Sequence, residues 1–232
     1  MKKLIALALA LVLCLAFVSC AKNPAEKSEG VMTYAEYMAA ELDTEVVIEA
    51  YVQATQSWWS DKITVYAADP DGAYFIYELA CSEADAAKLT PGTKIKVSGT
   101  KKAWAGEIEI MYPTFEFVND GVTYTSTATD ITGKIGSDDI INYQNQLVAF
   151  KGMTITAIEY KNGEPGDDIY VTVSKGETTY SFCVERYLTA PGTDVYKAFT
   201  DETVKVGDTV DIEGFLYWYE GVNTHITAIT KK

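Results

Sequence analysis

The sequence predicts an all-β protein in which a small five-stranded barrel occurs twice, each copy with a short helix between its third and fourth strands. Runs that alternate apolar and polar residues fill most of the chain, as half-buried strands require. The segment TPGTKIKVSG at residues 90–99 has a counterpart, KVGDTVDIEG, at residues 205–214. A constant spacing of 115 positions relates two sets of glycines: Gly92, Gly99 and Gly106, and Gly207, Gly214 and Gly221. Glycines at sharp bends are typical of closed barrels, so the repeat indicates a duplicated barrel.

The first copy begins with a helix and continues with strands. Thr33, with Glu36 three residues later, is typical of a helix N-terminus and predicts a helix over residues 34–42. Alternation then predicts strands over residues 45–52, 62–68, 73–80, 93–99 and 106–112. Asp69-Pro70-Asp71-Gly72 predicts the turn of a hairpin between the second and third strands. Ser82 predicts the cap of a short helix over residues 82–89.

The second copy follows the same order. Strands are predicted over residues 147–155, 169–174, 178–184, 209–219 and 224–230, with a short helix after Thr193. Ala50 of the first copy corresponds to Gly152 of the second, so a bulge at this point is expected more strongly in the second barrel.

The N-terminus predicts a lipoprotein of the bacterial cell membrane. Two lysines precede an apolar run that ends in Phe17-Val18-Ser19-Cys20, which resembles a lipobox with Cys20 as the lipidated residue. Ordinary secretory cleavage is the alternative. The predicted organisation is a signal peptide at 1–19, the lipidated cysteine and a disordered tether at 20–32, a first domain at 33–117, a linker at 118–140 that includes a short helix near residues 138–143, and a second domain at 141–232. The protein is therefore expected outside the cytoplasm on a lipid anchor.

Charge argues against nucleic acid as a partner. The chain carries 33 acidic residues and a formal net charge of −14. Binding to a phosphate backbone depends largely on lysine and arginine, and Arg186 is the sole arginine. A lysine cluster at 94, 96, 101 and 102 is expected to be neutralised by Glu107 and Glu109 on the next strand.

The order of strands and helix resembles the OB-fold, and residues 45–116 and 147–229 carry the resemblance. The segments VVIEAYVQA, ITVYAADPDGAYFIY and PGTKIKVSGTKKAWAGEIEI are similar to OB-type domains of bacterial extracellular nucleases and of bacterial lipoproteins. The resemblance implies a binding face across strands two and three, framed by the loops between strands one and two and between strands four and five.

Aromatic residues are the candidate ligand-binding residues. They lie in or beside those loops, or on strand two: Trp58, Trp59, Trp104, Tyr217, Trp218, Tyr219 and Tyr66. Tyr74 and Tyr77 are expected to extend the platform. Exposed aromatic rings suit a ligand that stacks on them. The alternative is that the rings fold back and close the ends of the barrels.

The sequence offers little for catalysis or for a metal. His225 is the single histidine, no nucleophile or phosphate-loop motif is present, and His225 is interpreted as a surface residue of the last strand. The acidic segments 69–71 and 164–168 are interpreted as turns, with calcium binding as the alternative. Cys81 and Cys183 either pair or remain buried thiols. No cofactor or metal is expected.

These observations predict a non-enzymatic, membrane-tethered extracytoplasmic binding protein that recognises a glycan, peptide or protein partner through its aromatic loops. One alternative is a single-stranded nucleic-acid-binding accessory protein. A second alternative is a structural or scaffolding lipoprotein with no small ligand.

Overall fold

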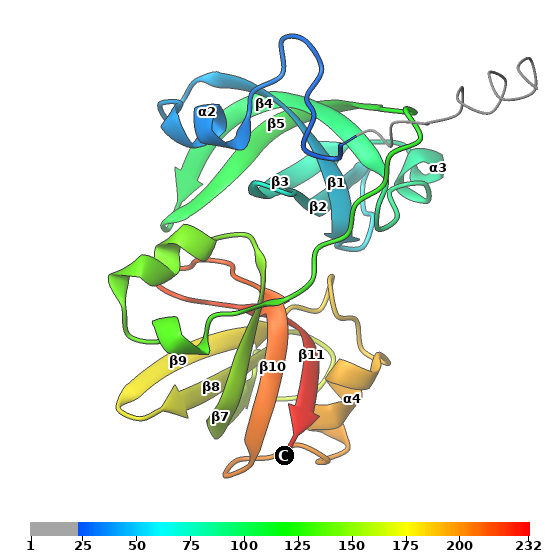
Figure 1. Cartoon of the computed structure of the whole chain (residues 1–232). Helices are drawn as coiled ribbons and strands as arrows, with labels where there is room; N and C mark the ends of the chain where they lie inside the picture. The colour runs from blue at the N-terminus through cyan, green and yellow to red at the C-terminus, as the bar shows by residue number, and fades with distance from the viewer. Residues whose placement is uncertain (1–22) are drawn as a thin grey trace, which may run out of the picture.

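The computed structural model describes residues 23–232, and within them the chain forms two β-barrels (Figure 1). The predicted signal peptide, Cys20 and the start of the tether lie outside the described residues. None of the helices between residues 23 and 232 has the length and hydrophobicity needed to cross a bilayer.

The first barrel has the strand order of an OB-fold. Its sheet closes in the order β1-β2-β3-β5-β4, because β1 also pairs with β4. Helix α2 precedes β1, and the single turn of α3 lies between β3 and β4. The elements are α2 (Tyr34–Ala39), β1 (Glu45–Thr55), β2 (Lys62–Asp69), β3 (Gly72–Ala80), α3 (Glu83–Ala86), β4 (Lys94–Trp104) and β5 (Glu107–Phe117).

The second barrel repeats this order. Strand β7 pairs with β8 and with β10, and the sheet runs β10-β11-β9-β8-β7. The elements are β6 (Thr129–Asp130), η1 (Thr132–Lys134), η2 (Asp138–Tyr143), β7 (Leu147–Tyr160), β8 (Ile169–Lys175), β9 (Thr178–Val184), α4 (Asp194–Thr200), β10 (Thr209–Phe215) and β11 (His225–Lys231). The predicted fold class, two tandem OB-like barrels with a helix between strands three and four, is confirmed.

The segment expected to be a disordered tether packs on the first barrel over its described part. The Lys27 ammonium contacts the buried Asp69 carboxylate at 2.5 Å and donates to the Glu49 carbonyl at 2.7 Å. The Met32 amide donates to the Val47 carbonyl at 2.9 Å. A buried ion pair outweighs the polar composition that predicted disorder.

The connection between the barrels is also anchored. Figure 1 shows it running along the outside from β5 towards the second barrel. The Ser126 amide donates to Gln53 Oε1 at 2.7 Å, and β6 pairs in parallel with β7. The second sheet therefore begins at Thr129, inside the segment expected to be a linker. The predicted short helix there is the 3-10 helix η2.

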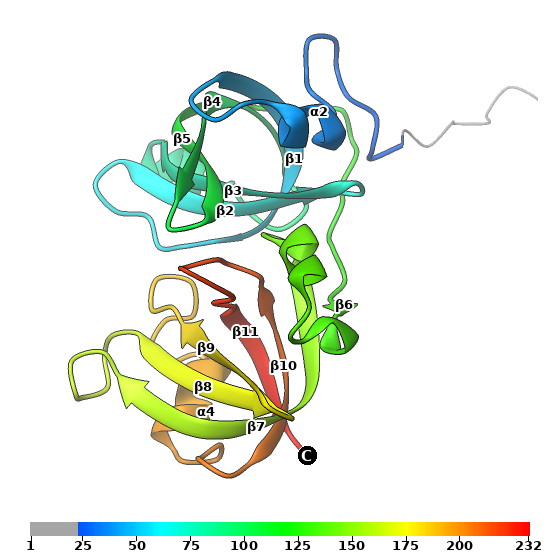
Figure 2. The same cartoon turned by 90° about the vertical axis from the view of Figure 1, so that its left-hand side faces the viewer.

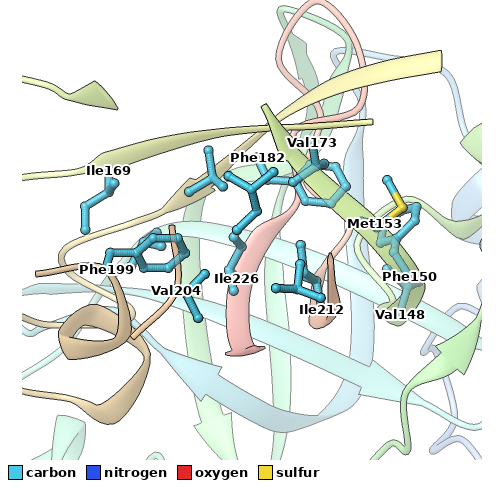
Figure 3. Close-up of a cluster of buried hydrophobic side chains, with 14 of the residues drawn as sticks. Val148, Phe150, Met153, Ile169, Val173, Phe182, Phe199, Val204, Ile212 and Ile226 are labelled. Carbon is cyan, nitrogen blue, oxygen red and sulfur yellow. The ribbon is translucent and has the colours of Figure 1, made fainter. Parts of the chain in front are cut away.

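Each barrel has its own core. Figure 3 shows the second core, where Phe150, Phe182 and Phe199 meet aliphatic side chains from β7, β8, β10 and β11. In the first core, Tyr37 of α2 packs against Tyr74 with ring centroids 5.0 Å apart. The predicted capping box at Thr33 is present, but Met38 and Leu42 are exposed and Tyr37 is the residue that α2 buries.

The two thiols do not pair. Cys81 and Cys183 are both free, and Cys183 is buried in β9. Burial raises the pKa of both thiols, so each remains a neutral apolar side chain.

The repeated glycines have two separate roles. Gly92 and Gly207 adopt φ values of +88° and +93°, which glycine tolerates best. Gly99 and Gly214 lie where β4 and β10 shift register against β5 and β11. A Cβ at Gly99 would lie 2.7 Å from Ile110 Cγ2 and 2.9 Å from the Met111 carbonyl oxygen. The duplication therefore preserves one turn and one close approach of backbones in each barrel.

The close approach at Gly99 predicts the cost of filling it. Gly99→Ala is expected to destabilise the protein by about 1–3 kcal/mol, because the added methyl forces two packed strands apart. Gly133→Ala is the matched control, since a Cβ there meets nothing within 4 Å. Chemical denaturation of the three proteins measures the difference. Equal midpoints for the two variants would contradict this explanation.

Candidate functional site

The binding face expected of the first barrel is covered by the second barrel. Strands β2 and β3 lie on the side of the first barrel that faces the second (Figure 2). Tyr66 of β2 stacks on Phe215 with centroids 4.5 Å apart, and Phe75 of β3 packs against Tyr217 at 5.2 Å. The centre of this face is therefore an interface within the chain.

His225 completes this interface. Its ring stacks on Tyr217 with centroids 4.3 Å apart, and its Nδ1 lies 2.6 Å from the Tyr66 hydroxyl. Burial lowers the pKa of His225 to about 3, so the imidazole is neutral at ordinary pH. The interpretation of His225 as a surface residue was wrong, because the strand face it occupies packs on the other barrel.

Four of the predicted ligand-binding residues serve as packing residues. Tyr66 is 1% exposed, and Tyr217 is half-buried beside it. Trp58 packs on the first core and donates its Nε1–H to the Cys81 carbonyl at 3.0 Å. Trp218 packs on the second core. The alternative that aromatic rings fold back onto the barrels describes Trp58 and Trp218, whereas Tyr66 and Tyr217 pack in the interface between the barrels. Tyr74, the proposed extension, is fully buried.

The other three predicted residues are exposed at two separate places. Trp104 and Tyr219 form a pair across the junction of the barrels, with centroids 5.2 Å apart. Both are about half exposed. Trp59, 74% exposed, lies in the loop between β1 and β2.

A groove lies beside Trp59 at the open end of the β2–β3 face. It has a volume of about 310 Å³. Trp59, Tyr77 and Tyr187 contribute its aromatic rings. The remaining lining residues are polar or charged, apart from one isoleucine: Gln56, Ser57, Lys62, Ile63, Thr64 and Glu78. We call this set of residues the aromatic groove.

Tyr187 belongs to the second barrel, and a backbone hydrogen bond to the first barrel holds it beside the aromatic groove. The Ser57 amide donates to the Tyr187 carbonyl at 2.8 Å. The Glu185 carboxylate accepts from the Tyr187 and Leu188 amides at 3.1 and 2.7 Å and so fixes the loop. Burial raises the pKa of Glu185 to about 6. The first barrel supplies the other lining residues, so docking of the second barrel adds the Tyr187 wall of the groove.

Sequence reasoning missed Tyr187, since a loop after a strand has no periodicity. The one available signal was Arg186 next to it. The Arg186 guanidinium lies over the Tyr187 ring at 5.0 Å from its centroid, a cation–π contact.

The charges near the aromatic groove nearly balance. The Lys62 ammonium pairs with Glu78 at 2.7 Å, and both side chains are exposed. Arg186 Nη1 lies 4.0 Å from Asp167 Oδ1. The groove consequently has one cation in its lining, Lys62, a second beside Tyr187, Arg186, and no strongly basic surface.

The lysine cluster of β4 is neutralised, but not by Glu107 and Glu109 as expected. Lys94 pairs with Glu49 and Asp120, both at 3.0 Å, Lys96 pairs with Glu116, and Lys102 pairs with Asp43. Lys101 instead donates to three carbonyls at the end of α2, those of Tyr37, Met38 and Ala40.

The acidic turns are held by protein groups. Asp69, 2% exposed, accepts from the Asp71 and Gly72 amides and from the Tyr74 hydroxyl, in addition to its contact with Lys27. Asp168 pairs with Lys161 at 2.9 Å. Within residues 23–232, no three side chains of His, Cys, Asp or Glu gather in a way that could hold a metal ion.

Comparisons with known proteins find similar solved structures but no matching family model and no matching curated protein. Solved structures that match include a murine DNA-binding protein bound to double-stranded DNA, at 10% identity, with 80% of this chain and 96% of that chain covered and a TM-score of 0.39. The HINb domain of p204 matches at 12% identity, over 83% of this chain and all of that chain, with a TM-score of 0.38. A replication protein A heterotrimer bound to single-stranded DNA matches at 13% identity, over 87% of this chain and 52% of that chain, with a TM-score of 0.32.

These comparisons correct the expected partners. A glycan, peptide or protein partner was expected and nucleic acid was considered unlikely, whereas several matched structures are described as complexes with DNA. The main interpretation is therefore withdrawn. The resemblance to OB-fold domains is confirmed by the barrel topology, and the likeness to domains of nucleases and lipoproteins stays a prediction.

Proposed function

We propose that the aromatic groove binds a short stretch of single-stranded nucleic acid. The observation that carries the proposal is the pair of exposed rings, Trp59 and Tyr187, which line one groove together with Tyr77 at the end of the β2–β3 face. Proteins that bind single strands combine rings on which bases stack with cations that follow the backbone.

Most of the lining residues have a role in this proposal. Trp59 and Tyr187 stack on successive bases, while Lys62 in the groove and Arg186, which lies over the Tyr187 ring outside the lining, face phosphates. Gln56, Ser57 and Thr64 offer polar groups to base edges. A volume of about 310 Å³ lies at the lower end of the range for small-ligand sites, so only one or two bases enter.

The net charge of −14 shapes the binding that we propose. A protein with so many carboxylates repels a long phosphate backbone. Stacking is much less sensitive to charge than phosphate contacts are, so the affinity comes mainly from the rings. Duplex DNA, whose bases are already stacked on each other, is expected to bind more weakly than a single strand.

The rings provide the first test. Trp59→Ala and Tyr187→Ala are each expected to weaken binding of a labelled oligothymidylate by about 1–3 kcal/mol, roughly 5- to 150-fold, because each removes one stacking surface. Fluorescence anisotropy measures the dissociation constants. Trp59 is exposed, so its removal leaves the cores intact.

Trp104→Ala is the matched control, because Trp104 is an exposed indole outside the aromatic groove. Its affinity should equal that of the unaltered protein. If Trp104→Ala weakens binding while Trp59→Ala does not, the groove is not the site.

Salt dependence provides the second test. With two cations at the groove, the logarithm of the association constant should fall with the logarithm of salt concentration at a slope no steeper than about −1.4. Titrations from about 50 to about 300 mM salt, a roughly sixfold range of concentration, measure the slope. A much steeper slope would show that binding uses a basic surface elsewhere.

We further propose that this binding takes place outside the cytoplasm, on a lipid anchor at Cys20. The sequence supports this through the charge-then-apolar order before Cys20. Cys20→Ser is expected to move the protein from the membrane fraction to the soluble fraction, because lipid chains hold it there. Fractionation followed by immunodetection measures the change, and an unchanged membrane fraction would argue against the anchor.

A further inference from the structure

Two carboxyl groups of the first barrel face the second barrel. On β5, Ile110 points into the first core, so Glu107 and Glu109 lie on the opposite face of the strand. Glu109 pairs in register with Phe75, which belongs to the interface between the barrels. Glu107 is fully buried and Glu109 is 6% exposed. The second barrel covers positions that an isolated barrel would present to water.

Glu107 is part of the contact between the barrels. Its Oε2 accepts a hydrogen bond of 2.8 Å from the Trp218 amide of the second barrel. Next to it, the Gln144 and Asn145 side chains of the second barrel donate to the Gly106 and Ile108 carbonyls at 2.9 and 3.0 Å. The Glu107 Oε1 atom has no hydrogen-bond partner among the described residues.

No cation in the described part of the chain neutralises Glu107. Its cross-strand neighbour on β4 is Trp104, and the lysine opposite Glu109, Lys102, pairs with Asp43. The ammonium of Lys101 is held by carbonyls of α2. A buried carboxylate without a cation is costly, whereas the neutral acid is far less so.

We propose that the two barrels dock through a protonated Glu107, so that docking is tight in acid and weakens as this carboxyl group ionises.

The direction of the pKa of Glu107 agrees with this geometry. Burial raises it to about 8, and the hydrogen bond from the Trp218 amide and the nearby Asn145 side chain lower it less than burial raises it. Undocked and exposed to water, the same group would ionise near its ordinary value of 4.5. Between these two pH values the docked state holds a proton that the undocked state has lost. Docking therefore weakens about tenfold for each unit that pH rises through this window.

Apart from Glu109, the other titratable groups facing Glu107 do not supply this effect above pH 6. Burial raises the pKa of Glu109 as well, which adds to the effect in the same direction. The phenols of Tyr37 and Tyr217 also have raised pKa values, with burial as the main cause, and stay neutral. His225 is neutral above a pKa of about 3, and Glu185, whose pKa is about 6, lies in the loop that carries Tyr187.

The variant Glu107→Gln tests the proposal, because glutamine keeps the oxygen that accepts from Trp218 and cannot ionise. The measurements are the exchange protection of the Trp218 amide and the radius of gyration by solution X-ray scattering, at pH 6 and pH 9. Glu116→Gln is the matched control, since Glu116 lies on the same strand and is exposed. The unaltered protein and the control should lose protection and expand at pH 9, and Glu107→Gln should keep clearly more protection and expand less, with Glu109 as the remaining ionisable group.

A carbon-13 titration of the glutamate side chains in the unaltered protein gives a second, direct measurement. Glu107 should titrate at least two units above its ordinary value, by the size of shift that full burial produces. Ionisation of Glu107 near pH 4.5, or equal protection of Trp218 at pH 6 and pH 9, would overturn the proposal. None of these measurements involves a ligand, so the result is independent of what the aromatic groove binds.

Discussion

The contact between the β2–β3 face of the first barrel and the end of the second barrel determines which surfaces of the two barrels stay open. Tyr66, Phe215 and His225 meet there, with a 2.6 Å contact between hydroxyl and imidazole, in surroundings that keep the histidine neutral. Removing the Tyr66 hydroxyl would leave Nδ1 of the buried His225 without its partner, whereas the hydroxyl itself also accepts from Gln56 Nε2 at 3.4 Å. The surface on which OB-folds commonly bind ligands is thus used within the chain, and only its open end remains as the aromatic groove.

The sequence was sufficient for each barrel but not for their relation. Alternation and the repeated glycines predicted the strands, because burial inside a barrel follows the two-residue period of a strand. The two-residue period does not predict which part of the protein covers the outward face of a barrel strand. Tyr66 was therefore expected on an open binding face, Glu107 beside lysines and His225 at the surface, although all three are buried. The tether was misjudged for the same reason, since Lys27 finds its partner Asp69 through the fold alone.

The candidate site was predictable only in part. The exposure of Trp59 was expected, because the loop between the first two strands commonly frames the binding face of an OB-fold. Trp58, its neighbour, points the other way and packs on the core. Tyr187 could not be found, since its position depends on docking and on the Ser57–Tyr187 hydrogen bond. A site that two domains form together cannot in general be predicted from the sequence pattern of either domain alone.

The net negative charge of the protein and the proposed proton on Glu107 both concern the cost of bringing negative charges together, over the whole molecule and at one buried group. A chain with a net charge of −14 resists bringing further negative charge together, whether this is a phosphate backbone or a carboxylate in an interface. At the interface the fold lowers this cost by keeping a carboxyl group neutral. At the groove it lowers the cost by offering rings in place of charges. Because Tyr187 reaches the groove only from a docked second barrel, ionisation of Glu107 would disturb both places together.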